Sequence, residues 1–341
     1  MSQRSRSKWL ILEETGVLHT SNADAVGDVE GVSGRWELNN FKSKFDVRIV
    51  SKTDQEMEFD LIGLDASISN AIRRVMMSEV PSMAVEKVII MQNSSVIQDE
   101  VLAHRLGLLP LKADPKFFQT KVPPPPDSDQ IEVNENDSLE FELKIKCSLN
   151  PKATKDMTDP DDIYLNHIVK TSDVKWLPIG LQSDMLKPED VGPVENDVVI
   201  AKLRPGHEID LKMVAWKGVG KDHAKFMPAT VWYRLLPEIR LKEKIEGERA
   251  YRLQKCFSPG VISVETNEKG VSVAKVSDAR YDSNSRNVFF HEDLKNSVEM
   301  GKILDHFIFH VESFGAQKPE TLVCEAIKIM MSKCTQFLEY L

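Results

Sequence analysis

The sequence has few cysteines, and they stand far apart. Its four cysteines are Cys147, Cys256, Cys324 and Cys334, and no two of them form a CxxC pair. This scatter excludes a cysteine-based metal knuckle and a disulfide framework, and it is typical of proteins that work in a reducing compartment. We therefore expect a chain that holds no metal and needs no other cofactor.

Long apolar runs are also missing. Near the N-terminus only residues 9–12 form an apolar run, which is too short for a signal peptide. No segment approaches the ~20 apolar residues of a membrane-spanning helix. We expect a protein of the cytosol or nucleus that has no membrane partner.

Positive charge is in deficit. The chain has 44 Lys and Arg against 53 Asp and Glu, a formal net charge of −9. An acidic chain is a poor candidate for binding phosphate backbones by itself. If the protein serves nucleic-acid chemistry, we expect it to reach DNA only indirectly, through protein partners. Direct nucleic-acid binding is thus a disfavoured alternative.

Recognisable catalytic motifs are absent as well. Residues 218–223 read GVGKDH, which lacks the GxxxxGK[ST] spacing of a phosphate loop, so we interpret them as a tight turn between strands. His306 and His310 flank a Phe-Ile-Phe alternation that predicts a strand, on which they would lie about 13 Å apart, too far to share one zinc. No carboxylate pair stands out at helical or strand spacing in an apolar context. The sequence favours a non-enzyme, and an enzyme with an unrecognised site stays the alternative.

The clearest helix pattern runs from residue 65 to residue 80. Asp65 can cap its N-terminus by accepting from free backbone amides, and Pro81 ends it. Its apolar residues follow the spacing of one helical face: Ile68, Ala71, Ile72, Val75 and Met76. Its opposite face is polar around Met77: Asn70, Arg73 and Arg74. That polar face is either solvated or a docking surface.

A second long helix is predicted at the C-terminus, beginning at Pro319, a favoured first-turn residue. One stripe on it is continuously apolar: Val323, Ala326, Met330, Cys334, Phe337 and Leu341. Neighbouring apolar residues widen the stripe until much of the circumference is apolar: Leu322, Ile327, Ile329 and Met331. Such a helix needs cover on more than one side. The cover comes either from its own domain or from a partner, and the pattern leaves both open.

Other segments predict a mixture of strands and short helices. The cleanest strand is 139–147, where strict alternation indicates one buried and one solvated face and hence antiparallel pairing. A short helix is expected from residue 99, ended by Gly107 as a left-handed cap, and another over 287–300. The four prolines at 123–126 predict a stiff exposed loop. Further strands are expected at 45–50, 57–62, 85–91, 197–203, 208–215, 230–236, 270–276 and 307–311.

Several motifs together resemble one family. NAIRR, EVPSMAVEKV and DEVLAHRLGLLPL, all within residues 59–115, closely resemble the alpha-like subunits of multisubunit RNA polymerases, which are homologous to the bacterial alpha N-terminal domain. LRPGHEIDL, GKDHAKF, YRLLPEI and CFSPGVI resemble the larger version shared by polymerases I and III. The resemblance covers about residues 36–341. Polymerase II relatives carry a cysteine cluster in a region where this chain has only Cys147, which disfavours the polymerase II alternative.

The resemblance implies an α+β fold and a role in assembly. Residues 1–35 would be a flexible arm, 36–83 and 230–341 a discontinuous dimerisation domain, and 84–229 an inserted, mainly β domain. The chain would be a non-catalytic scaffold in the nucleus, at the nucleolus with polymerase I and in the nucleoplasm with polymerase III. It would thereby support transcription of rRNA, 5S rRNA and tRNA.

The resemblance also implies partners for the two long helices. A smaller alpha-like subunit would pack against one set of residues: Ile68, Ala71, Ile72, Val75, Val323, Ala326, Met330, Cys334 and Phe337. The second-largest catalytic subunit would dock on the polar face: Asn70, Arg73 and Arg74. Small zinc-binding common subunits would join the same assembly.

Overall fold

The computed structural model describes residues 11–13, 16–18, 37–121, 133–154, 157–267 and 270–341. Most of the predicted N-terminal arm and the four-proline run lie outside these residues. The chain divides into two units, residues 1–46 and 47–341. In the first unit, strands β1 (Ile11–Glu13) and β2 (Gly16–Leu18) pair antiparallel, and helix α1 spans Leu38–Lys44. The rest of the fold belongs to the second unit.

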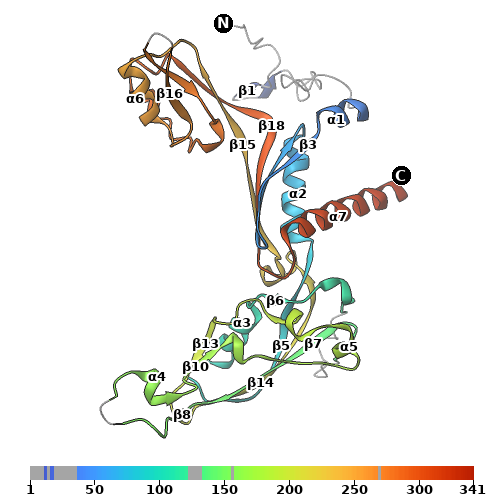
Figure 1. Cartoon of the computed structure of the whole chain (residues 1–341). Coiled ribbons are helices and arrows are strands. Elements are labelled where there is room, and N and C mark those ends of the chain that lie inside the picture. Colours follow the sequence, from blue (N-terminus) through green and yellow to red (C-terminus); the bar gives the residue numbers. More distant parts are fainter. Residues whose placement is uncertain (1–10, 14–15, 19–36, 122–132, 155–156, 268–269) are drawn as a thin grey trace. The chain divides into compact units, whose positions relative to one another are not determined.

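One four-stranded sheet joins segments from both ends of the second unit, in the order β15-β18-β4-β3. Its strands are β3 (Asp46–Lys52), β4 (Glu56–Ile62), β15 (Ala229–Leu241) and β18 (Val298–Ser313). Helices α2 (Ala66–Ser78) and α7 (Pro319–Glu339) contact this sheet and each other (Figure 1). Beneath them lies an apolar layer, in which the rings of Phe59 and Phe309 stack with centroids 5.3 Å apart.

The second four-stranded sheet has the order β11-β7-β14-β5 and uses only residues between 81 and 219. Its strands are β5 (Pro81–Asn93), β7 (Ser138–Lys146), β11 (Lys175–Leu177) and β14 (Glu208–Val219). The alternation in β7 buries Leu139, Phe141 and Leu143 completely. The other face carries cross-strand ion pairs such as Lys212 with Glu140 at 2.8 Å, so the predicted wet face and antiparallel pairing are confirmed.

Helix α3 (Asp99–Gly107) packs Leu102 and Leu106 into the core of this second sheet. The prediction that Gly107 is a left-handed cap was wrong, because Gly107 does not have a positive φ. The helix ends at Leu108, which is right-handed and whose N–H bonds to the carbonyls of His104 and Arg105 at 3.2 and 3.3 Å. These hydrogen bonds close the last turn without any residue in the left-handed conformation.

Short elements connect the strands of the second sheet. Three small antiparallel pairs form among them, β6 with β12, β8 with β9 and β10 with β13. The strands are β6 (Leu111–Lys112), β8 (Ser148–Leu149), β9 (Tyr164–Leu165), β10 (Ile168–Lys170), β12 (Gly192–Pro193) and β13 (Val199–Lys202). The helical turns among them are η3 (Pro115–Phe117), α4 (Pro160–Ile163), η4 (Thr171–Asp173), α5 (Gln182–Met185) and η5 (Pro188–Asp190), while η6 (Ala224–Phe226) lies between β14 and β15.

A third packed region lies between β15 and β18 in the sequence. Helix α6 (Glu248–Cys256) covers the hairpin of β16 (Ile262–Thr266) and β17 (Ser272–Val276), and the 3-10 turns η7 (Ala279–Tyr281) and η8 (Asn287–Phe290) follow. Its own core includes Ile245, Leu253, Val261, Val288 and Leu294. None of the helices in the described residues combines the length and the hydropathy that crossing a membrane requires.

The helix predicted over 287–300 was wrong. Only Asn287–Phe290 are helical, as one 3-10 turn, and β18 begins at Val298. Val298 and Met300 pair with Leu241 and Ile239 of β15. This long-range strand pairing outweighs the local pattern of apolar residues that suggested a helix.

Candidate assembly interface

Helix α2 begins as its sequence predicts. The Asp65 carboxylate accepts from the Ser67 backbone N–H at 2.7 Å, which satisfies one of the free amides of the first turn. Hydrogen bonds from the Ser67 side chain and backbone lower the pKa of Asp65. The cap therefore fixes where the helix starts and which residues face the sheet.

The apolar face of α2 is used mostly by the chain itself. Ile72 and Val75 are each 7% exposed and pack with Met76 toward the sheet. Ile68 is 39% exposed, and Ala71 is half-buried. Of the four α2 residues in the predicted dimer interface, the single chain thus leaves Ile68 and Ala71 with surface to offer.

The C-terminus of α2 is held by the turn that the GVGKDH segment forms between β14 and β15. The Lys221 N–H bonds to the Ser78 carbonyl at 2.8 Å. A Cβ on Gly220 would lie 2.3 Å from the Met77 carbonyl oxygen, so the close approach requires glycine. The prediction of a turn is confirmed, and its position shows that it fixes the end of α2.

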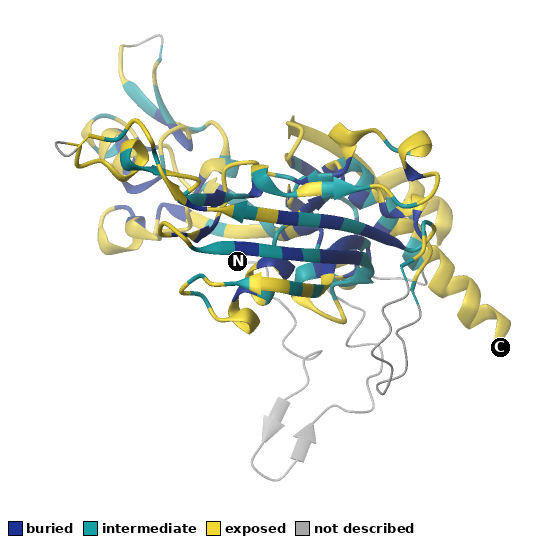
Figure 2. Cartoon of the chain, turned by 90° about the horizontal axis from the view of Figure 1, so that it is seen from below, coloured by how far each residue is buried: buried dark blue, intermediate teal, exposed yellow. Residues whose placement is uncertain are grey.

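The two halves of α7 differ in exposure. In the first half Leu322 and Ala326 are fully buried, and Val323 and Met330 are half-buried. From residue 331 to the C-terminus every side chain is exposed, with Phe337 at 71% (Figure 2). Cys334, another residue of the predicted stripe, lies in this exposed half. An exposed apolar surface of this kind is typical of a protein–protein contact site.

The polar arc of α2 is partly open, with Asn70 and Arg73 half-buried. Arg73 Nε donates to Asn70 Oδ1 at 3.1 Å, and Arg73 Nη1 lies 3.5 Å from the Met77 sulfur. Arg74 is exposed. Within the part of the chain that the structure describes, neither arginine pairs with a carboxylate. Both guanidinium groups can therefore accept an anionic or carbonyl partner from another protein.

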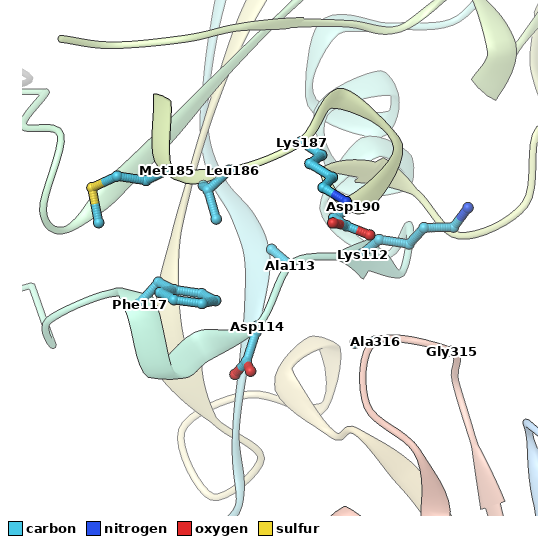
Figure 3. A pocket seen from close by; sticks show the side chains of 10 residues that line it. All are labelled: Lys112, Ala113, Asp114, Phe117, Met185, Leu186, Lys187, Asp190, Gly315 and Ala316. Carbon is cyan, nitrogen blue, oxygen red and sulfur yellow. The ribbon is translucent and has the colours of Figure 1, made fainter. Parts of the chain in front are cut away.

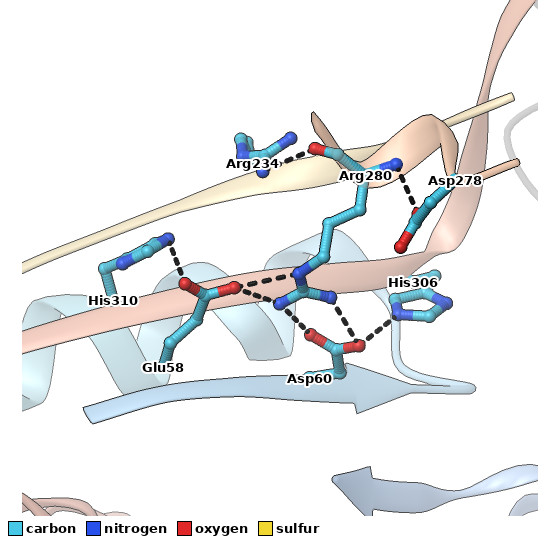
Figure 4. A network of polar contacts seen from close by, with 7 residues as sticks. All are labelled: Glu58, Asp60, Arg234, Asp278, Arg280, His306 and His310. Atoms are coloured by element: carbon cyan, nitrogen blue, oxygen red, sulfur yellow. Dashed lines mark hydrogen bonds and ion pairs between the residues drawn. The ribbon is translucent and has the colours of Figure 1, made fainter. Parts of the chain in front are cut away.

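Sequence reasoning missed a polar cluster on the face of the first sheet that points away from α2 and α7 (Figure 4). Arg280, from η7, donates to Glu58 Oε1 at 2.9 Å through Nε. Its Nη1 and Nη2 donate to the two oxygens of Asp60 at 2.9 and 2.8 Å. His306 Nε2 lies 3.0 Å from Asp60, and His310 Nε2 lies 3.4 Å from Glu58.

The electrostatics of this cluster favour its charged form. Burial opposes ionisation of Asp60, but hydrogen bonds from Arg280 and His306 outweigh it and lower the pKa of Asp60. Burial likewise opposes the charge on Arg280, yet its carboxylate partners raise its pKa. The cluster ties η7 to β4. It also corrects the statement that no carboxylate pair stands out, because Glu58 and Asp60 alternate with core residues in EMEFDLI, a signal that was present in the sequence.

Two further observations concern possible metal and ligand sites. Among the described residues, no group of three His, Cys, Asp or Glu is arranged to hold a metal ion. A cavity of about 370 Å³ opens beside the turn at Gly315 and Ala316, and side chains of both charges and several apolar groups line it (Figure 3). Its charged lining residues are Lys112, Asp114, Lys187 and Asp190, which do not form the nucleophile–base pair of a covalent catalyst.

Comparison with known proteins agrees with this geometry. The model of the RNA polymerase Rpb3/Rpb11 dimerisation domain matches residues 58–334. A Mus musculus protein named DNA-directed RNA polymerases I and III subunit RPAC1 is 48% identical, over 97% of this chain and 94% of its own length. The Saccharomyces cerevisiae protein of that name is 43% identical, over 94% of this chain and 95% of its own length. A Dictyostelium discoideum polymerase II subunit, rpb3, is 32% identical, over 85% of this chain and 92% of its own length.

The family match covers α2, most of α7, strands β15 and β18 and most of β4. The capped helix α2, the beginning of the exposed part of α7 and the α+β core therefore all lie within it. The chain therefore belongs to the RNA polymerase Rpb3/Rpb11 dimerisation-domain family of alpha-like polymerase subunits.

Proposed function

We propose that the chain is a non-catalytic scaffold subunit shared by nuclear RNA polymerases I and III. The observation that carries the proposal is the set of exposed apolar side chains in the second half of α7, in a chain of a dimerisation family. The high identity to proteins named as subunits of polymerases I and III supports the choice of polymerases. The lower identity to the rpb3 subunit and the single cysteine between residues 84 and 229 argue against a polymerase II subunit.

In this role the chain pairs with a smaller alpha-like subunit. The second half of α7, with Ile68 and Ala71 of α2, supplies the contact surface, while Ile72, Val75 and Ala326 support it from within. The dimerisation part comprises 36–83 and 230–341, and the inserted part comprises 84–229. RNA synthesis takes place on the large subunits, and the chain contributes to rRNA, 5S rRNA and tRNA production by nucleating assembly in the nucleolus and nucleoplasm.

The pair then presents a composite surface to the second-largest catalytic subunit and to small zinc-binding subunits. Asn70, Arg73 and Arg74 are the docking residues that we assign to the second-largest subunit. An arginine fork suits this task because it can hold a carboxylate or two carbonyls at once. The Arg73–Asn70 hydrogen bond orients one such fork before the partner arrives.

Pairing is tested by placing charge on the exposed stripe of α7. We expect Cys334→Asp with Phe337→Asp to weaken binding of the smaller alpha-like subunit about 100-fold or more, because two apolar contacts become buried charges. Both side chains are exposed, so the free chain should keep its fold. Ser332→Asp with Gln336→Asp adds the same charge to the opposite side of α7 and should bind normally. Native mass spectrometry of the co-expressed pair measures both, and normal pairing of the first variant would refute the interface.

The same preparation tests docking. Arg73→Glu with Arg74→Glu should leave the alpha-like pair intact and reduce recovery of the second-largest subunit when a tagged copy is purified from cells. Lys175→Glu with Lys202→Glu provides a control of equal charge change at two exposed positions away from α2 and α7. Recovery of the chain alone, as a homodimer or with polymerase II would overturn the proposed function.

A further inference from the structure

The sheet face that points away from α2 and α7 is ordered in rows. Strands β15, β18 and β4 are antiparallel neighbours, and their register is regular over Ala229–Leu235, before it shifts between Leu235 and Pro237. Over this stretch, side chains directly opposite one another form rows across the three strands. The outer row is Thr230, Glu312 and Glu56. The middle row is Trp232, His310 and Glu58, and the inner row is Arg234, Ile308 and Asp60.

The inner part of this face already binds an arginine. Glu58 and Asp60 hold the guanidinium of Arg280, which comes from a turn more than 200 positions away in the sequence. The Arg280 backbone carbonyl accepts in turn from Arg234 Nη2 at 2.9 Å. Two neighbouring carboxylates on this sheet thus bind one planar guanidinium, which hydrogen-bonds to both of them and comes from a separate segment (Figure 4).

The outer row repeats two carboxylates without such a cation. Glu312 and Glu56 lie directly opposite each other, and both are exposed. Among the described residues, no side chain donates a hydrogen bond or forms an ion pair to either carboxylate. Like charges directly opposite on neighbouring strands destabilise a sheet. Burial lowers the pKa of the adjacent His310, so this ring does not supply the missing positive charge at neutral pH.

An aromatic platform adjoins these two carboxylates. The Trp232 ring stacks on His310 with centroids 3.9 Å apart and an interplanar angle of 10°. Trp232 is nevertheless 47% exposed, so much of the indole is open to a ligand. A guanidinium lying on a tryptophan gains a cation–π contact, and its N–H groups stay free for carboxylates at its edge.

We propose that Glu312 and Glu56 of the outer row, together with Trp232 of the middle row, receive an arginine side chain of another polypeptide in the assembled polymerase. The guanidinium stacks on Trp232 and bonds to the two glutamates, as Arg280 bonds to Glu58 of the middle row and Asp60 of the inner row. Arginine fits better than lysine because Glu58 and Asp60, the neighbouring carboxylates, already bind a planar guanidinium. The inference rests on the proposed function, since the partner is a component of that assembly.

The test uses the full chain in polymerase purified from cells. Thr230, exposed in the same row as Glu312, is replaced by the photo-crosslinker p-benzoylphenylalanine, and mass spectrometry identifies the attached peptide. We expect one partner peptide with an arginine within about three residues of the attachment point, the reach of the extended chain beside the row. Glu56→Gln with Glu312→Gln should lower the crosslink yield roughly tenfold.

A matched control separates the site from the general charge of the chain. Glu299→Gln with Glu189→Gln removes two exposed carboxylates elsewhere and should leave the yield unchanged. Glu312→Arg should also abolish the crosslink, and exchange of the partner's arginine for glutamate should restore it.

Three results would overturn the inference while the proposed function stands: no crosslinked polypeptide, a peptide without arginine, or a yield that the glutamine variants leave unchanged. In each of these the chain is still recovered with polymerases I and III. If it is absent from both polymerases, the proposed function fails, and the inference fails with it.

Discussion

The two faces of the sheet formed by β3, β4, β15 and β18 are both partly buried, but by different chemistry. On one face Phe59, Phe307 and Phe309 are at most 2% exposed. On the other face Glu58 and Asp60 are covered by a guanidinium from η7. The same sheet therefore supports an apolar layer under two helices and an ionic cluster under a loop.

The difference lies in how each face responds to damage. Apolar contacts are non-directional and shared among many neighbours, so the stability lost on truncating a side chain scales with the volume removed. The ionic cluster depends on one group, because without Arg280 the two carboxylates lack their principal cation in a region that water reaches poorly. Apolar truncations should therefore give graded losses, whereas the ionic face should fail when one residue is removed and recover when its partners are neutralised.

The largest effect is expected on the apolar face. Phe309→Ala should lower the free energy of unfolding by about 3–5 kcal/mol, because a fully buried ring is replaced by a cavity. Urea unfolding of the full chain bound to its alpha-like partner measures the change. Phe309→Leu should cost clearly less, and Phe290→Ala, at a ring that is 84% exposed, should cost almost nothing. Equal losses for Phe309→Ala and Phe290→Ala would contradict this description of the core.

A somewhat smaller loss is expected on the ionic face. Arg280→Met should destabilise by about 3 kcal/mol, since two partly buried carboxylates remain unpaired. Adding Glu58→Gln and Asp60→Asn should restore much of the loss, because the uncompensated charges are then gone. Arg240→Met removes an arginine whose ion pair is exposed, and it should leave unfolding unchanged. If the triple variant is no more stable than Arg280→Met, the cluster stabilises by shape and not by charge.

Local sequence signals gave much of the fold. Asp65 and Pro319 each predicted the start of a helix, and the alternation in 139–147 predicted a half-buried strand. All three signals depend on interactions within a few residues. The helix predicted over 287–300 was wrong because β18 pairs with β15, a partner some 60 positions away. Local periodicity carries no information about such a partner.

The candidate interface was predictable only in outline. A helix that is apolar around most of its surface does not reveal which side its own chain covers. The structure shows Ala326 fully buried and Phe337 exposed on the same predicted stripe. Ile72 and Val75 likewise turned out to face the chain's own sheet. The ionic cluster brings together β4, β18 and η7, and the pairing of Glu58 with Arg280 depends on the tertiary fold alone.

The smallest expected effect is a pH dependence of the free energy of unfolding that arises on the polar face of the sheet. Burial, as the main cause, lowers the pKa of His310 below 6.5, so the unfolded chain takes up this proton first as the pH falls. The free energy of unfolding should therefore decrease as the pH is lowered from 7.5 through 6.5 and level off below the folded-state pKa. His310→Gln should flatten this slope, and His104→Gln, at an exposed helical position, should keep it. Asp60 does not interfere, because its pKa lies below 3.8 and the carboxyl is ionised throughout this window. A slope that persists unchanged in His310→Gln would show that His310, although it stacks on Trp232, is not the group that makes this face sensitive to pH.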